Sequence, residues 1–251
     1  MGKHKLFYLL VAACIFVQNA GNIFAAEIHV AVSANFTFVI RKITKNFEAE
    51  TGHKVRLISG STGKHFAQIK NGAPFDAFFA ADVKRPKLLD DEGIAQKGSR
   101  FTYAFGKLIL WSPSKSYIDV DGKVLKQGNF RHLALANPKL APYGKAAQEV
   151  LQALELWDEL SRSAVRGENI GQTFQFVKTG NAELGFVAFS QIKRPGQPLV
   201  GSFWEVPEVL YAPIEQQAVL LKNNEIARAF LSFIKSKKSR KIIRRFGYKT
   251  K

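Results

Sequence analysis

The amino-acid sequence predicts an α/β fold with two doubly wound lobes joined by a two-strand hinge. In each half of the chain, short apolar runs alternate with amphipathic segments of helical period. Two further extended segments, 105–111 and 215–221, lie where the halves meet. Two crossings of the chain indicate that a second lobe, 108–216, is inserted into a first lobe made of 27–107 plus 217–251.

The individual elements follow from periodicity and from turn residues. In the first half we expect strands over 27–32, 54–58 and 76–80, with helices ending near Gly52, Asn71 and Gly93. In the second half we expect strands over 132–136 and 184–189, a helix from Ala146 through Trp157, and a helix through Phe174 and Val177. An amphipathic helix over 226–233 closes the chain. Strands separated by helices predict parallel sheets.

The N-terminus is typical of a secretory signal peptide over residues 1–26. Lys3 and Lys5 precede an apolar run over 6–17, and small residues continue to Ala26. The chain is therefore predicted to be exported to the periplasm. Cys14, the only cysteine, lies in a lipoprotein-like box, so a lipid anchor is an alternative; the apolar residues after it disfavour that reading.

The formal net charge of +17 is compatible with a nucleic-acid partner, but its distribution argues against one. The densest basic run, 235–245, has the pattern of a solvated helix face, with no interleaved aromatic platform and no zinc-finger spacing. We predict no nucleic-acid partner. Adhesion to anionic surfaces through this run remains an alternative.

Four polar corners, each between a predicted strand and a predicted helix, are the main candidate site. They are 33–35, 60–63, 142–144 and 169–171, two in each lobe. In open α/β sheets ligands bind at such corners, where helix N-termini present free N–H groups that suit an anion. Ordinary helix caps would have a similar composition, and that alternative stays open. The stretch 60–64 is no nucleotide phosphate loop, because Ile58 and His65 stand where glycine and Ser or Thr are needed.

Catalytic interpretations find little support in the residue spacing. The histidines outside the signal segment lack metal-ligand spacing, and no Gly-x-Ser-x-Gly elbow is present. Ser61 and His65 have no orienting carboxylate nearby, and Asp76 and Asp82 have no further support as an acid–base pair. We therefore predict a protein that is not an enzyme and needs no cofactor.

Several segments together resemble a known family. They are 31–36, Gly60-Ser61-Thr62-Gly63, 71–82, 98–104, Asn137-Pro138 with 141–144, Asn169-Ile170-Gly171-Gln172, 184–188 and Phe246-Gly247-Tyr248. Over nearly all of its length after the signal segment, the chain resembles the periplasmic molybdate-binding proteins of ABC transporters. The resemblance implies a periplasmic-binding-protein-like fold of type II, with two lobes that close over one tetrahedral oxyanion.

The resemblance also implies the ligand residues. Ala34 and Asn35 would contact the oxyanion, Asn35 through its side chain and its main chain; Thr62 would offer a hydroxyl, with Ser61 as a possible addition. Tyr143 and Ile170 would donate main-chain N–H groups. Some members use a tyrosine where this chain has Ala188, which leaves the fifth contact undefined.

The function implied is capture of molybdate, and of tungstate, in the periplasm by a monomer that delivers it to an ABC permease. Molybdenum would be held only as the oxyanion, without direct metal ligands. Two alternatives remain: a binding protein for another tetrahedral oxyanion such as sulfate, and a basic exported protein that adheres to surfaces.

Overall fold

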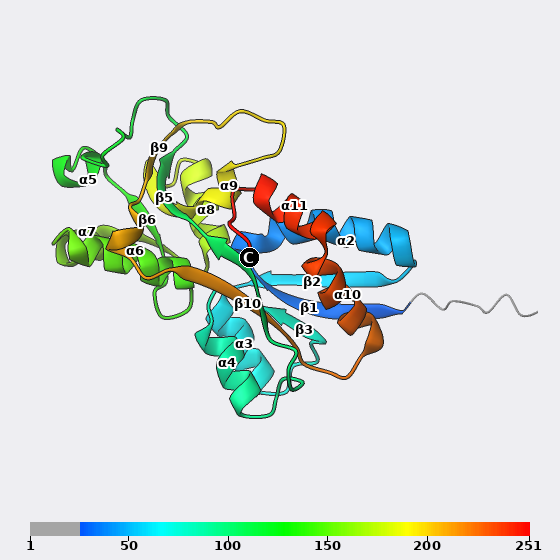
Figure 1. Ribbon diagram of the computed structural model, residues 1–251. Coiled ribbons are helices and arrows are strands. Elements are labelled where there is room, and N and C mark those ends of the chain that lie inside the picture. The colour runs from blue at the N-terminus through cyan, green and yellow to red at the C-terminus, as the bar shows by residue number, and fades with distance from the viewer. Residues whose placement is uncertain (1–25) are drawn as a thin grey trace, which may run out of the picture.

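The structure, a computed structural model, describes residues 26–251 and contains two five-stranded mixed sheets, each covered by helices on both faces (Figure 1). The predicted signal segment, apart from Ala26, and Cys14 lie outside the described residues. Among the residues described, no helix has the length and apolar character needed to cross a membrane. The two sheets confirm the predicted two-lobed α/β architecture.

Lobe 1 is built on the sheet with strand order β2-β1-β3-β10-β4. Its strands are β1 (Glu27–Ser33), β2 (Lys54–Gly60), β3 (Ala77–Phe79), β4 (Phe101–Gly106) and β10 (Ile214–Leu220). Its helices are the 3-10 turn η1 (Ala34–Phe36), α2 (Thr37–Thr51), α3 (Thr62–Lys70), α4 (Lys84–Asp91), α10 (Glu225–Lys235) and α11 (Lys237–Arg245).

Lobe 2 is built on the sheet with strand order β7-β6-β8-β5-β9. Its strands are β5 (Leu108–Ser112), β6 (Leu133–Ala136), β7 (Val165–Gly167), β8 (Leu184–Ala188) and β9 (Ser202–Glu205). Its helices are α5 (Val124–Gln127), α6 (Pro142–Ala153), α7 (Trp157–Ser163), α8 (Ile170–Lys178), α9 (Phe189–Ile192) and the 3-10 turn η2 (Glu208–Leu210).

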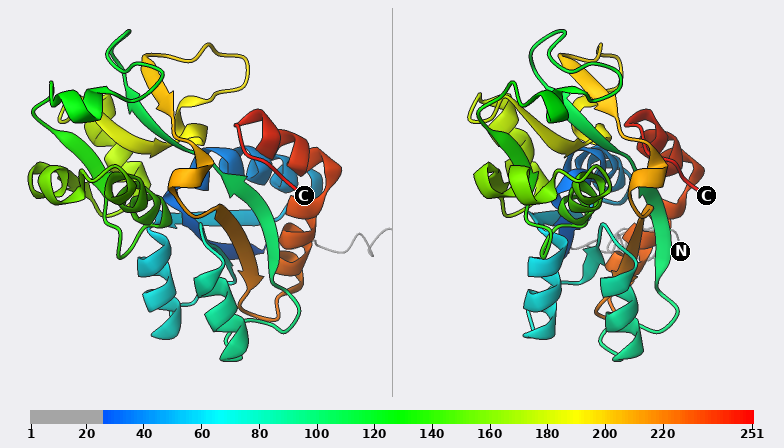
Figure 2. Two further views of the ribbon diagram at one scale, coloured as in Figure 1. Left: turned by 60° about the vertical axis from the view of Figure 1, so that its left-hand side comes forward. Right: turned by 90° about the vertical axis from the view of Figure 1, so that its left-hand side faces the viewer.

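Alternating side chains of each sheet build two cores, one on each face. In lobe 1, Ile28, Val30 and Val32 of β1 pack with α2, α10 and α11, whereas Ala31 packs with α3 and α4. Figure 2 shows these two groups of helices on opposite faces of the sheet. Lobe 2 repeats this arrangement, with α6 and α7 on one face and α8 on the other. Burial on both faces explains why the strands read as continuous apolar runs.

The sheets are mixed, whereas the strand–helix alternation predicted parallel ones. In lobe 1, β1 pairs in parallel with β2 and β3, but β10 is antiparallel to both β3 and β4. In lobe 2, β5 is antiparallel to β8 and β9. The exceptions involve the strands next to the lobe crossings. A chain that arrives from the other lobe enters the sheet from the opposite end, and so runs against its neighbours.

The hinge differs from the sequence prediction in one respect. The predicted extended segment 105–111 is two strands in two sheets, because β4 ends at Gly106 and β5 begins at Leu108 with Lys107 between them. The return crossing runs from β9 through η2 to β10. The predicted lobe boundaries thus fall at Lys107 and within β10, between Gln216 and Gln217, where the β10–β4 register shifts.

Two other predicted elements need correction. The helix expected through Trp157 ends at Ala153, and Trp157 begins α7. Glu155 between them has a φ of 62°, a left-handed conformation that cannot continue a helix. The strand expected over 184–189 ends at Ala188, because Phe189 opens the short helix α9.

Candidate functional site

All four polar corners meet between the lobes around one small cavity. Its volume is about 10 Å³. It is lined by Ser33, Ala34, Asn35, Gly60, Ser61, Thr62, Ala81, Ala141, Pro142, Tyr143, Asn169 and Ile170. The structure therefore brings together every predicted ligand residue, Ala34, Asn35, Thr62, Tyr143 and Ile170, and the additional candidate Ser61.

The lobe 1 corners contribute hydroxyl groups. Ser33 Oγ and Thr62 Oγ1 are hydrogen-bonded at 2.5 Å, and the Ala81 N–H donates to Thr62 Oγ1 at 3.1 Å. Ser33 and Thr62 are 2% and 1% exposed. The two hydroxyls carry two protons and share one hydrogen bond, so one proton remains for a ligand. Sequence reasoning placed Ser33 at a corner but did not name it as a site residue.

Some main-chain N–H groups at the corners donate to the side chains that cap the helices. Ser61 Oγ accepts from the N–H of Lys64 at 3.3 Å. Asn169 Oδ1 accepts from the N–H groups of Gly171 and Gln172 at 2.9 and 3.0 Å. Ser61 and Asn169 are thus N-caps, as the alternative interpretation of the corners had it. The Ser61 hydroxyl keeps its own proton, because it only accepts in this bond.

Other main-chain donors at the corners remain free. The first N–H groups of a helix have no acceptor within it. Within residues 26–251, the N–H groups of Thr62, Tyr143 and Ile170 donate to no protein acceptor. Each lies at the first or second position of its helix, where the helix dipole adds a partial positive charge. The corners therefore contain both N–H groups that donate to a capping side chain and N–H groups that have no acceptor.

Close approach of backbone fixes the α6 corner. A Cβ on Gly144 would lie 2.4 Å from the carbonyl oxygen of Ala136 at the end of β6. Only glycine can hold the first turn of α6 against the strand in this way. The same turn carries Tyr143, which is 1% exposed. The position of the Tyr143 N–H is therefore set by packing of the backbone.

The cavity is electrically neutral in its protein groups. No charged side chain belongs to its lining. Lys64 lies outside the lining and forms an exposed ion pair between the lobes: its Nζ lies 2.9 Å from Glu168 Oε2. The lobes are also joined by the Gly63 N–H, which donates to Leu140 O at 2.8 Å. An anion here would be held by hydrogen bonds and helix termini rather than by a counter-ion.

The Asn35 side chain is hydrogen-bonded to other side chains of the protein. Its Nδ2 donates to Gln216 Oε1 at 2.7 Å and to Tyr248 OH at 2.9 Å. In this arrangement both amide hydrogens are used inside the protein, and the donation of the Asn35 side chain to an anion stays a prediction. Asn35 Oδ1 is buried and has no partner among the described residues. Ala188, the position of the family's variable tyrosine, is buried at the end of β8 and is not part of the lining.

His65 supports the second corner without entering the cavity. A Cβ on Gly60 would lie 2.8 Å from His65 Nε2, so the imidazole packs directly on that corner. Burial lowers the pKa of His65 below its ordinary value of 6.5, and a hydrogen bond with Gln68 opposes that shift. His65 is therefore neutral at pH 7 and adds no charge beside the cavity.

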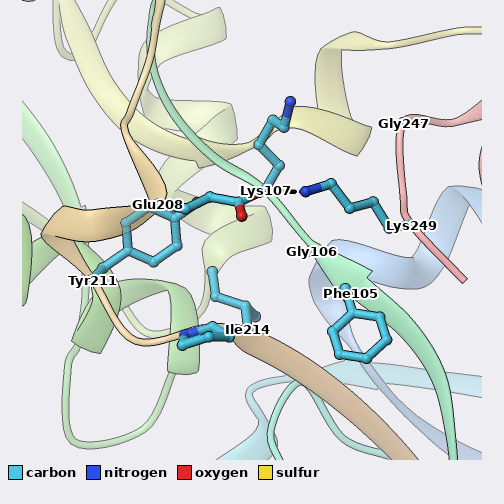
Figure 3. A pocket seen from close by; sticks show the side chains of 9 residues that line it. Phe105, Gly106, Lys107, Glu208, Tyr211, Ile214, Gly247 and Lys249 are labelled. Carbon is cyan, nitrogen blue, oxygen red and sulfur yellow. Dashed lines mark hydrogen bonds and ion pairs between the residues drawn. The ribbon is translucent and has the colours of Figure 1, made fainter. Parts of the chain in front are cut away.

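A separate cavity lies at the hinge. It measures about 100 Å³ and is lined by residues of β4, η2, β10 and the C-terminal segment (Figure 3). Lys249 Nζ lies 2.7 Å from Glu208 Oε1 beside it. It shares no residue with the four corners. Among the described residues, no cluster of three or more His, Cys, Asp or Glu side chains could hold a metal ion.

Comparison with known proteins agrees with this geometry. The chain is 50% identical over 227 residues to the molybdate-binding protein ModA of Azotobacter vinelandii, covering 89% of this chain and 90% of that protein. It is 46% identical over 230 residues to ModA of Rhodobacter capsulatus, covering 90% and 89%. The solved structure of the Azotobacter vinelandii periplasmic molybdate-binding protein matches with a TM-score of 0.87 at 42% identity, covering 89% of this chain and 99% of that one. The family model of bacterial extracellular solute-binding proteins matches residues 28–249, and the chain belongs to that family.

Proposed function

We propose that this protein binds molybdate, and also tungstate, in the periplasm and delivers it to an ABC permease. The observation that carries the proposal is the small cavity between the lobes, lined by helix N-termini from both and by no charged side chain. We infer the ligand from two relatives, 50% and 46% identical to this chain, that are named as molybdate-binding proteins.

The donor set suits an oxyanion that only accepts hydrogen bonds. Molybdate at neutral pH is a tetrahedral dianion without protons. The free N–H groups of Thr62, Tyr143 and Ile170 and the spare hydroxyl proton of the Ser33–Thr62 pair all donate. No carboxylate lines the cavity to accept a proton from a protonated phosphate. Charge-assisted hydrogen bonds of this kind are stronger than neutral ones.

Capture would proceed by closure of the lobes. The four corners enclose about 10 Å³, so a tetrahedral oxyanion can enter only when the lobes separate. On closure, donors from both lobes replace the water around the ion. The separation of the corners would then set which ion size is held well, which discriminates molybdate and tungstate from the smaller sulfate. The closed form would be the one that the permease recognises.

Export and assembly complete the proposal. The basic, apolar and small-residue pattern over residues 1–26 would direct the chain to the periplasm, and a monomer is sufficient because both halves of the cavity come from one chain. A sulfate-binding protein of Mycobacterium tuberculosis, at 14% identity and a TM-score of 0.70, shares the fold alone. The competing ligand is another tetrahedral oxyanion without protons, such as sulfate, because it too only accepts hydrogen bonds.

Titration calorimetry on the chain without residues 1–26 tests the proposal. We expect tight binding of molybdate and tungstate at a stoichiometry of one, weak binding of sulfate, and no binding of phosphate. Tighter binding of sulfate or phosphate than of molybdate would refute the assignment of the ligand. A chain that binds no oxyanion and adheres instead to anionic surfaces in a salt-sensitive way would refute the whole proposal.

A further inference from the structure

A buried cluster of polar side chains lies beside the cavity, and these side chains have no part in the donor set described so far. Its members come from both lobes and the hinge, and all are at most 5% exposed. They are Asn35, Tyr103, Tyr143, Ser190, Gln216 and Tyr248. Burial raises the pKa of Tyr248 to about 12, and raises the pKa values of Tyr103 and Tyr143 well above their ordinary range. The cluster is therefore uncharged at physiological pH.

Gln216 is the junction of this cluster. Its Oε1 accepts from Asn35 Nδ2 at 2.7 Å and from Tyr103 OH at 3.0 Å. Its Nε2 donates to Tyr143 OH at 3.2 Å. Gln216 is 0% exposed and lies on the hinge strand β10 at the register shift against β4. One side chain thus connects a lobe 1 corner with a lobe 2 corner.

The backbone at the hinge makes room for this junction. A Cβ on Gly106, the last residue of β4, would lie 2.0 Å from Tyr143 OH and 2.6 Å from Gln216 Nε2. Glycine is therefore required at this position for the two polar groups to meet.

Tyr248 and Ser190 extend the cluster across the lobes. Ser190 Oγ, on α9 of lobe 2, lies within donating distance of Tyr248 OH at 2.8 Å and of Asn35 O at 3.1 Å. Tyr248 OH in turn lies 3.0 Å from Asn35 O and 2.9 Å from Asn35 Nδ2. These bonds join Asn35 of lobe 1 to α9 of lobe 2.

One atom in the cluster is unsatisfied. Asn35 lines the cavity, is 1% exposed, and its Oδ1 has no partner among the described residues. A buried acceptor without a donor destabilises the folded chain. An oxyanion cannot satisfy it, because both groups only accept. Asn35 would have to present its nitrogen at this position to bind an anion.

The partners of the two amides allow that reversal. If Gln216 and Asn35 both exchange oxygen and nitrogen, Gln216 Nε2 donates to Asn35 Oδ1 and to Tyr103 OH, and Gln216 Oε1 accepts from Tyr143 OH. Tyr248 OH can then donate to Asn35 Oδ1. Every partner is a hydroxyl or an amide, and each of these can donate or accept. The bonds of Gln216 are kept. Tyr248 then gives its one proton to Asn35 Oδ1 instead of Asn35 O, and Ser190 Oγ donates to Asn35 O, so the bond between Ser190 and Tyr248 is given up. Asn35 Nδ2 becomes free for the anion.

We propose that Gln216 is a positioning residue for anion binding: it holds the Asn35 amide and couples the orientations of the two amides, so that Asn35 presents its nitrogen to an oxyanion only when Gln216 turns its own nitrogen toward Asn35. This inference rests on the proposed function, since it concerns the same cavity. With its oxygen toward the cavity, Asn35 has one buried acceptor without a partner; with its nitrogen there, the side chain can donate to an oxyanion. A reversal of Asn35 alone would set its Oδ1 against Gln216 Oε1, so the second amide has to follow.

Gln216→Met tests the inference, with Gln217→Met as the matched control. Gln217 is the next residue of β10, is 7% exposed, and bonds to Arg100 and Thr102 outside the cluster. Both variants lose one buried amide from the same strand. We expect Gln216→Met to weaken molybdate binding about tenfold or more, and Gln217→Met to change it less than about twofold.

Side-chain amide NMR on the uniformly ¹⁵N-labelled chain gives a second readout that a purely structural role would not move. Saturation with molybdate should shift the amide signals of both Asn35 and Gln216 and leave those of Gln217 in place. Equal losses of affinity in the two variants, or a shift of the Asn35 signals without those of Gln216, would overturn the inference. Failure of the unmodified chain to bind molybdate would instead count against the proposed function.

Discussion

The two lobes contribute to the same cavity by different chemical means. Lobe 1 offers mainly side chains: Ser33, Ser61 and Thr62 all bring hydroxyls to its corners, beside the free N–H of Thr62. Lobe 2 offers main chain, since the donors of Tyr143 and Ile170 are N–H groups. The half-site of lobe 1 therefore depends on residue type, whereas that of lobe 2 depends on the backbone path. Substitutions should separate the two cases.

The largest effect is expected from Gly144→Ala in lobe 2. Its Cβ would lie 2.4 Å from Ala136 O, so the start of α6 must move away from β6 and carry the Tyr143 N–H with it. We expect a loss of molybdate affinity of more than about tenfold and a fall of about 1–3 kcal/mol in the free energy of unfolding. Calorimetry and urea denaturation measure the two quantities. Lys145→Ala, on the exposed side of the same turn, is the control and should change neither appreciably.

Thr62→Ala comes next and probes lobe 1. It removes the hydroxyl that pairs with Ser33 and accepts from Ala81. We expect the binding free energy of molybdate to weaken by about 1–3 kcal/mol, the cost of one lost charge-assisted donor. Thr62→Ser, which keeps the hydroxyl, should bind as the unmodified chain does. Unchanged affinity in Thr62→Ala would show that lobe 1, like lobe 2, binds the anion through its main chain alone.

Acidification should weaken the fold through His65. Its pKa is lowered in the folded chain by burial, so the unfolded chain binds more protons as the pH falls below about 6.5. Stability is therefore full above pH 6.5 and is lost as the pH falls from there through the folded pKa. We expect the midpoint of urea denaturation to fall between pH 7 and pH 5, and to fall less in His65→Gln. An identical pH profile in that variant would assign the effect to other groups.

Ile170→Val should have the smallest effect on binding. The donor at this corner is the main-chain N–H, which the substitution retains. We expect affinity within about twofold of the unmodified chain and a stability loss of about 0.5–1.5 kcal/mol, the usual cost of a buried methylene. A large loss of affinity would mean that the Ile170 side chain shapes the cavity, and the contrast between the lobes would fail.

Much of the fold was predictable because its signals are local. Apolar runs and helical periodicity predict the principal strands and helices, and the turn residues of the four corners predict the candidate site. Short edge strands such as β7 and β9 carry too few residues to show a pattern. The break at Lys107 was missed because 105–111 is extended throughout, and only pairing with two different sheets divides it. The left-handed backbone conformation at Glu155 could likewise not be predicted, because the residue there is not a glycine.

The parts of the site that escaped prediction depend on contacts between distant segments. Gln216 is 181 residues from Asn35, and Lys64 is 104 residues from Glu168. No local sequence pattern shows that a side-chain amide is hydrogen-bonded to a distant residue, or which of its atoms points toward the cavity. The adjacent Gln216 and Gln217, followed in the same strand by Ala-Val-Leu, were the one available signal, because a buried amide needs partners.

The central claim is that donors from both lobes hold one oxyanion at the four corners. Diffraction from crystals grown with molybdate, recorded at the molybdenum absorption edge, tests it most directly. We expect one anomalous peak enclosed by the four corners, with oxyanion oxygens within about 3 Å of the N–H groups of Thr62, Tyr143 and Ile170. A peak at the basic face of α11, at the hinge cavity, or beside one lobe alone would contradict the account.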